Sequence, residues 1–289
     1  MLDPSDSENE TVCEGVIRAI FSVAWEDDEV TSTTTLKELS NPEIRALRDN
    51  VESVLTSIQD EELEPAHAVF LRVKCALLQE SKQLTEIQRS QQLQKIFVDV
   101  PVLCDVLMTH LQNFKTSIKD RQDRTNDLDE EESESYEENQ SFICLQLLKI
   151  SRFTDLQEEG SRRHFFSILR EILTSLETPD LLIDSCLQSM LMAHEHETEF
   201  VKDVSTILND ILRMSTSSET MNSVETQIMA ASNETKLRMA SILSVVLEKV
   251  ARTNTEDGNL NSFHSLIMPM VTSENVTLKE AGVSCLGKF

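Results

Sequence analysis

Apolar side chains recur every three or four positions through most of this chain. In the segment FFSILREIL, for example, Phe165, Leu169 and Ile172 form one stripe, which Leu176 extends. Residues three and four apart share one face of an α-helix, so this spacing predicts helices that bury one face on a core. We predict helices near residues 10–25, 42–59, 65–80, 84–97, 101–118, 139–152, 161–176, 179–193, 198–214, 219–231, 234–252, 259–271 and from 276 onward.

Prolines stand at the starts of several of these helices, at Pro42, Pro65, Pro101 and Pro179. Proline lacks an N–H group, and this costs nothing in the first helical turn. Short polar turns join the helices, and helix pairs repeat at roughly 35 to 45 residues, the range of known helical repeats. The arrangement favours an α-solenoid of antiparallel helix pairs, with a large irregular helical bundle as the alternative.

The segment from Arg124 to Gln140 interrupts the helical pattern. It is rich in carboxylates and has almost no apolar residue. Like charges at this density repel one another, so we predict a disordered acidic loop over 124–140 that separates helical blocks 10–123 and 141–289. Ser135 has an acid three positions later, at Glu138, and is a candidate phosphoacceptor.

Composition supports the all-α interpretation. The chain has 5 glycines, 6 prolines and only 4% aromatic residues. A β-sandwich or a doubly wound α/β fold of this size needs many turns, which glycine and proline normally supply. The 6 cysteines are scattered through helical stretches with no C-x-x-C pair, so we expect buried, reduced thiols.

The net charge of −25 argues against direct binding of DNA or anionic lipid by this chain. Its best basic cluster is interleaved with Asp120 and Asp123, and consists of Lys115, Lys119, Arg121 and Arg124. No apolar run approaches the roughly 20 residues of a spanning helix, and the N-terminus is acidic, unlike a secretion signal. We therefore expect an intracellular, soluble protein with no membrane association.

The sequence offers little catalytic chemistry. His194 and His196 in AHEHE are two apart, so on a helix they point to different sides and do not clamp one metal ion. We expect a helix end there. Known nucleotide-binding, nucleophile and zinc-protease motifs do not occur. We expect no enzyme activity, no catalytic, metal-binding or cofactor-binding residue and no cofactor.

The last residues, LIMPMVTSENVTLKEAGVSCLGKF, resemble a HEAT repeat. Pro269 would bend the first helix, a polar turn follows, and Leu278 and Lys279 begin a second helix that continues to Leu286 and Gly287. We expect Lys279 to reach acceptors in the turn of the adjacent repeat. The apolar face of this second helix predicts that Phe289 is not a natural end, that the chain is part of a longer solenoid, and that its final helix frays in isolation.

The same residues resemble more specifically the condensin G subunit family, which is also called nuclear condensin complex subunit 3. In that family a similar phrase carries arginine where this chain has Lys279 and alanine where it has Gly282, so the resemblance implies a slightly weaker helix here. The stretch from ICLQLLKISRF to TEFVKDVSTILNDI resembles the middle region of that family. AVFLRVKCALLQ and PVLCDVLMTHLQNF resemble the helices upstream of it.

The resemblance implies a non-enzymatic HEAT-repeat scaffold of the condensin complex that acts in mitotic chromosome condensation. Its partners would be the kleisin subunit and, through it, the SMC subunits, while the complex and not this acidic stretch would bind DNA. The location would be the nucleus and mitotic chromosomes, with a cytoplasmic pool. A HEAT or armadillo adaptor of another class, such as a transport receptor or a phosphatase scaffold, is the alternative.

Overall fold

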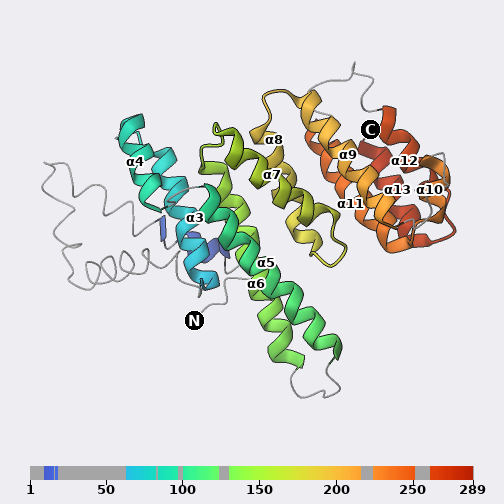
Figure 1. The fold of residues 1–289 in the computed structure, drawn as a ribbon, viewed down its shortest axis with the longest axis horizontal. Coiled ribbons are helices and arrows are strands. Elements are labelled where there is room, and N and C mark those ends of the chain that lie inside the picture. The colour runs from blue at the N-terminus through green and yellow to red at the C-terminus, as the bar shows by residue number, and fades with distance from the viewer. Residues whose placement is uncertain are drawn as a thin grey trace, which may run out of the picture. The chain divides into compact units, whose positions relative to one another are not determined.

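The structure, a computed structural model, describes residues 10–15, 17–18, 63–82, 84–96, 100–123, 130–215, 224–250 and 261–288. Helices are the regular secondary structure of these ranges, with no strand among them (Figure 1). They are α3 (Pro65–Glu80), α4 (Glu86–Ile96), α5 (Val100–Asp123), α6 (Glu130–Ile150), η3 (Ser151–Phe153), α7 (Glu159–Thr174), η4 (Asp180–Leu182), α8 (Ile183–Ala193), α9 (Glu197–Ser215), α10 (Val224–Ala230), α11 (Asn233–Val250), α12 (Asn261–Val271) and α13 (Val276–Lys288). Residues 10–15, 17 and 18 are helical as well.

The helix starts marked by proline are confirmed where the structure describes them. Pro65 is the first residue of α3, and the N–H of Ala68 donates to the Glu64 carbonyl at 3.1 Å. Pro101 lies in the first turn of α5, and Pro179 directly precedes η4. The predicted helix near 42–59 lies outside the described residues.

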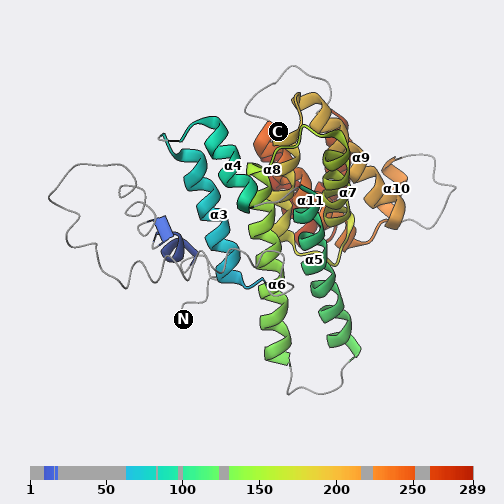
Figure 2. The ribbon, with the colours of Figure 1, turned by 60° about the vertical axis from the view of Figure 1, so that its left-hand side comes forward.

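The chain divides into two compact units, Met1–Ser161 and Arg162–Phe289. In the first unit, α5 packs along α6, and α3 packs against both α6 and α4 (Figure 2). In the second unit, α10 contacts α12, α11 contacts α13, and α12 packs on α13. With α10–α11 and α12–α13 taken as two successive helix pairs, the first helix of one pair contacts the first helix of the other, and the second helix contacts the second. This is the pattern of a stack of helical repeats.

The predicted acidic loop over 124–140 is wrong for residues 130–140, which belong to α6, while residues 124–129 lie outside the described residues. Arg121 on α5 compensates the acids of α6 through ion pairs with Glu134 at 3.2 Å and Glu137 at 3.1 Å. The hydroxyl of Ser117 also donates to Glu137 at 3.4 Å. Charge repulsion therefore does not prevent the helix, since a basic side chain of the neighbouring helix lies against it.

This pairing also changes the predicted division of the chain. Blocks 10–123 and 141–289 were expected on either side of the acidic segment, but α5 and α6 pack together within the first unit. The two compact units instead divide between Ser161 and Arg162. Residues 130–140 of the acidic segment therefore belong to a helix that packs along α5, and they do not separate two blocks of helices.

The apolar stripes form the core almost as the spacing predicts. Phe165, Leu169 and Ile172 of α7 are at most 1% exposed. The stripe of α9 is buried as well, at Phe200, Val204, Ile207, Leu208 and Ile211. Leu176 differs, being 38% exposed, because α7 ends at Thr174 and the chain turns before it.

All six cysteines are free thiols, as expected. Cys75, Cys104, Cys144, Cys186 and Cys285 have no exposed surface, whereas Cys13 is half-buried. Burial raises the pKa of the Cys104 thiol to about 11 and that of Cys144 to about 12. These thiols are protonated and act as small apolar side chains. None of the described helices combines the length and the apolar character that crossing a bilayer requires.

Candidate functional site

The HEAT-like phrase at the end of the chain forms a helix, a turn and a second helix. Pro269 lies inside α12, and α13 begins at Val276 after the turn. The side-chain oxygen of Asn275 caps α13 by accepting the N–H of Leu278 at 3.1 Å. Leu278 is 1% exposed and anchors α13, while Leu286 is half-buried.

The two departures from the family phrase have different environments. A Cβ atom on Gly282 would lie 2.8 Å from the backbone N of Val271 and 3.0 Å from Cβ of Met270. Gly282 therefore lets α12 and α13 approach closely, and the expectation that it merely weakens the helix is incomplete. Lys279 is exposed on α13, and a Cβ on Gly287 would meet nothing within 4 Å.

Ser135, the candidate phosphoacceptor, is exposed near the start of α6. Glu138 is one helical turn further on and is exposed too. The acidic context noted in the sequence therefore lies on a helix and not in an extended loop.

His194 ends α8, as expected for a helix end, and its side chain is 11% exposed. Its ring lies 5.0 Å from the ring of Phe166 and 6.3 Å from that of Phe200, measured between centroids. Its Nε2 lies 3.1 Å from a carboxylate oxygen of Asp203. His194 at the end of α8 thus contacts the middle of α7 and the first turns of α9. Within the described ranges no three His, Cys, Asp or Glu side chains gather to hold a metal ion.

The second unit contains a buried guanidinium that the sequence analysis missed. Arg238 on α11 is 4% exposed and donates to the carbonyls of Ile172 at 2.7 Å and Leu173 at 3.3 Å. It also donates to the Thr178 carbonyl at 3.0 Å and to Asp180 at 2.6 Å. The last four carbonyls of a helix have no partner within that helix, and Arg238 satisfies two of those of α7.

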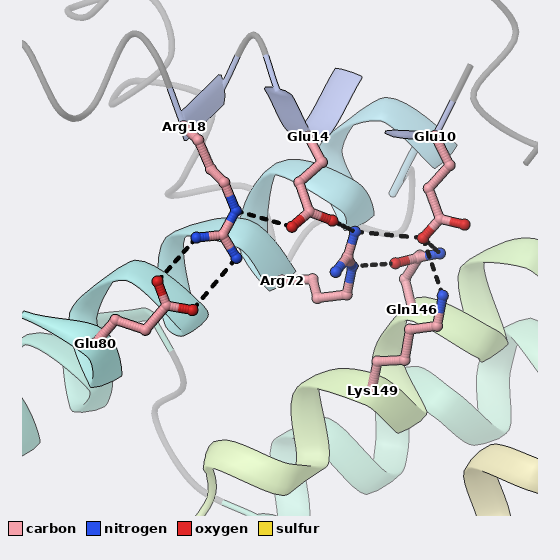
Figure 3. A network of polar contacts seen from close by, with 7 residues as sticks. All are labelled: Glu10, Glu14, Arg18, Arg72, Glu80, Gln146 and Lys149. Atoms are coloured by element: carbon pink, nitrogen blue, oxygen red, sulfur yellow. Dashed lines mark hydrogen bonds and ion pairs between the residues drawn. The ribbon is translucent and has the colours of Figure 1, made fainter. Parts of the chain in front are cut away.

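The first unit has a larger polar network, which joins the N-terminal helical residues to α3 and α6 (Figure 3). Arg72 of α3 pairs with Glu14 at 2.7 Å and Glu10 at 3.3 Å. Its Nε donates to the side-chain oxygen of Gln146 at 2.7 Å, and the amide of Gln146 donates to Glu10 at 3.0 Å. Lys149 of α6 pairs with Glu10 at 2.9 Å.

Arg18 extends this network to the end of α3. It pairs with Glu14 at 2.8 Å and with Glu80 at 2.9 Å. Burial on its own would raise the pKa of the Glu14 carboxyl, but the hydrogen bonds and charges of Arg72 and Arg18 outweigh burial and lower that pKa. Glu14 is therefore held ionised between two guanidinium groups.

These residues carried a signal in the sequence. Arg72 lies between Leu71 and Val73, and Gln146 and Arg238 also lie within apolar helices. A polar residue inside an apolar stripe either turns out to solvent or finds a buried partner, and periodicity alone does not tell which.

The arrangement consists of hydrogen-bond and ion-pair networks at the junctions of helices. Such junctions hold neighbouring helices together. The described networks therefore stabilise the packing of helices within each unit.

Comparison with protein-family models and with curated proteins finds no match to this sequence. A chain of the S. pombe condensin Cnd3-Cnd2 subcomplex is similar in structure, with a TM-score of 0.56 and 18% sequence identity. The similarity covers 88% of this chain and 31% of that chain, so this chain spans less than a third of its neighbour's length.

This likeness concerns the fold. The structural neighbour belongs to a condensin subcomplex, and the described residues here are helical throughout their regular elements. The expected all-α fold, a HEAT-repeat stack of helix pairs, is confirmed, and the condensin resemblance of the sequence has a structural counterpart.

Proposed function

We propose that this chain is part of a HEAT-repeat scaffold subunit of condensin, binds the kleisin subunit and supports mitotic chromosome condensation without catalysing a reaction. The single observation that carries the proposal is the structural similarity to a chain of the Cnd3-Cnd2 subcomplex over 88% of this chain. The order of the family-like sequence phrases supports it independently.

The partners and location follow from that assignment. The kleisin would connect this subunit to the SMC subunits, and the assembled complex would bind DNA. The net charge of −25 supports a role in protein contacts, because DNA binding by this chain would need clustered cations. Location in the nucleus and on mitotic chromosomes, with a cytoplasmic pool, belongs to the same proposal.

Co-purification tests the proposal. The tagged protein, isolated from mitotic cells of its own organism, should carry the condensin kleisin and the SMC subunits in stoichiometric amounts. Direct binding to the purified condensin kleisin, compared with the kleisin of another SMC complex as control, then tests the contact itself.

Two results would contradict the proposal. One is the absence of the condensin kleisin from the purified material. The other is equal binding of both kleisins in the direct assay. Recovery of transport cargo or of a phosphatase catalytic subunit instead would favour an adaptor of another class.

A further inference from the structure

We propose that the face of α3 and α6 carrying Arg72, Gln146 and Lys149 is a docking site for an acidic amphipathic helix, which the chain's own N-terminal residues occupy reversibly. We call residues 10–15, 17 and 18 the strap, and the face of α3 and α6 beneath them the strap site (Figure 3). A protein partner whose helix has the same chemistry would compete with the strap for this site. The inference does not depend on the proposed condensin function.

The strap site presents polar groups that need an acidic ligand. Gln146 has no exposed surface, and the side chains of Arg72 and Lys149 are 14% and 26% exposed. In the described part of the chain, the carboxylates that pair with Arg72 and Lys149 belong to Glu10 and Glu14 of the strap. Partly buried cations without a counter-charge are unfavourable, so the site favours any helix that brings carboxylates to the same places.

Apolar residues complete the site. Val69 and Val73 of α3 and Phe142 of α6 form a small buried cluster, and Cys13 and Ile17 of the strap pack against it. Glu10 and Glu14 are four residues apart, and so are Cys13 and Ile17. This spacing places carboxylates and apolar side chains on adjacent strips of one helix, as in complexes where an amphipathic helix binds a groove.

One of the contacts that hold the strap to α3 lies at the surface. The ion pair of Arg18 with Glu80 joins side chains that are 35% and 59% exposed. Ion pairs between such exposed groups are weak and are screened by salt. Gly15 lowers helix propensity, and a Cβ there would meet nothing within 4 Å, so packing does not require this glycine.

The cysteines provide a direct readout of strap release. Cys13 lies in the strap, whereas the other cysteines have no exposed surface. Because Cys13 is only half-buried while the strap is docked, it is the increase in its maleimide labelling rate in the full chain that reports release of the strap. Labelling of the buried cysteines, located by peptide mapping, reports any unfolding separately.

The test compares the wild-type chain with the double variant E10K/E14K, which repels the strap from Arg72 and Lys149. A matched control is E274K/E280K, which makes the same charge change at two exposed positions of the second unit. We expect Cys13 of E10K/E14K to be labelled about tenfold faster or more, with the control unchanged. Raising the ionic strength to about 1 M, where screening acts within about 3 Å, should speed Cys13 labelling of the wild type too.

Docking in trans is tested with a fluorescent peptide of residues 8–20. It should bind E10K/E14K about tenfold more tightly than the wild type or the control, because its site is vacated there. Adding R72E to E10K/E14K should abolish that binding, and a peptide with Glu14 changed to arginine should restore part of it. The proposal would be overturned if Cys13 were labelled at the same rate in E10K/E14K and the wild type at both ionic strengths. It would also be overturned if E274K/E280K bound the peptide as tightly as E10K/E14K does.

Discussion

Single residues decide how the helices of each unit are joined. Arg238 is the strongest case, because it contacts both the end of α7 and Asp180. The carbonyl of Ile172 that it binds lies 66 residues earlier in the sequence. The carboxyl side chain of Asp180 is 63% exposed, whereas that of Arg238 is 3% exposed. We therefore expect the hydrogen bonds from the guanidinium to the carbonyls to stabilise the fold more than the ion pair with the exposed Asp180 does.

We expect R238L to lower the free energy of unfolding of the second unit by about 3 kcal/mol, because the carbonyls of Ile172 and Leu173 lose their side-chain donor. D180N should cost less, since water replaces much of an exposed partner. Urea unfolding, with hydrogen exchange to locate the change in α7, measures both. R213L on the exposed side of α9 is the control and should change stability by less than about 0.5 kcal/mol. An R238L protein as stable as that control would contradict the assignment.

Two glycines of α13 form a matched pair. G282A should destabilise the second unit by about 1 to 3 kcal/mol, because its Cβ would meet the backbone of Val271 at 2.8 Å. G287A should be neutral or stabilising by up to about 1 kcal/mol, because its Cβ would meet nothing within 4 Å. Thermal unfolding of both variants gives the comparison. Equal melting temperatures of G282A and G287A would contradict the inference that α12 and α13 approach too closely for a side chain at position 282.

His110 makes stability depend on pH. Burial lowers the pKa of its imidazole below the usual 6.5, more than the hydrogen bond to Gln140 at 2.7 Å raises it. The unfolded chain therefore takes up a proton at a higher pH than the folded chain. Stability contributed by the neutral ring is complete above pH 6.5 and is lost as the pH falls toward the folded pKa.

The difference in unfolding free energy between wild type and H110Q should therefore change by up to about 1.4 kcal/mol for each pH unit between 6.5 and the lower pKa of the folded chain. Glutamine keeps a hydrogen-bond donor for Gln140 and does not titrate. H196Q changes an exposed histidine and serves as the control. If H110Q follows the same pH profile as the wild type, His110 is not the titrating group.

At the scale of elements, the hairpin of α5 and α6 shows how a neighbouring helix overrides local charge. Local repulsion predicted a loop over 124–140, yet residues 130–140 are helical. Glu137 is buried against α5, with its side chain 10% exposed, and pairs with Arg121 at 3.1 Å. The density of acids was read correctly from the sequence, but their counter-charge lies on another helix.

We expect R121E to loosen the first half of α6, because it replaces the cation between Glu134 and Glu137 with a third carboxylate. Hydrogen exchange of the amides of residues 133–140 should become about fivefold to tenfold faster, which corresponds to about 1 to 1.4 kcal/mol. K119E makes the same charge change at an exposed position of α5 and should leave these amides protected. Equal exchange in both variants would show that Arg121 does not hold α6.

At the scale of the whole molecule, the sequence by itself determined that the protein is helical and where most described helices lie. The reason is that an α-helix depends on contacts three and four residues apart, which apolar spacing, prolines and the scarcity of glycine record directly. The HEAT-like phrase at the end could be identified from the sequence for the same reason, because its residues lie within one short stretch of the chain.

Only the tertiary structure decided which helices are partners and which polar residues are buried between them. Arg72, Gln146 and Arg238 are ordinary polar residues in sequence, and their roles depend on groups 58 to 136 residues away. The close approach at Gly282 and the helical state of residues 130–140 likewise depend on a second helix. Burial and charge pairing are properties of neighbours in space, and distance along the chain does not specify those neighbours.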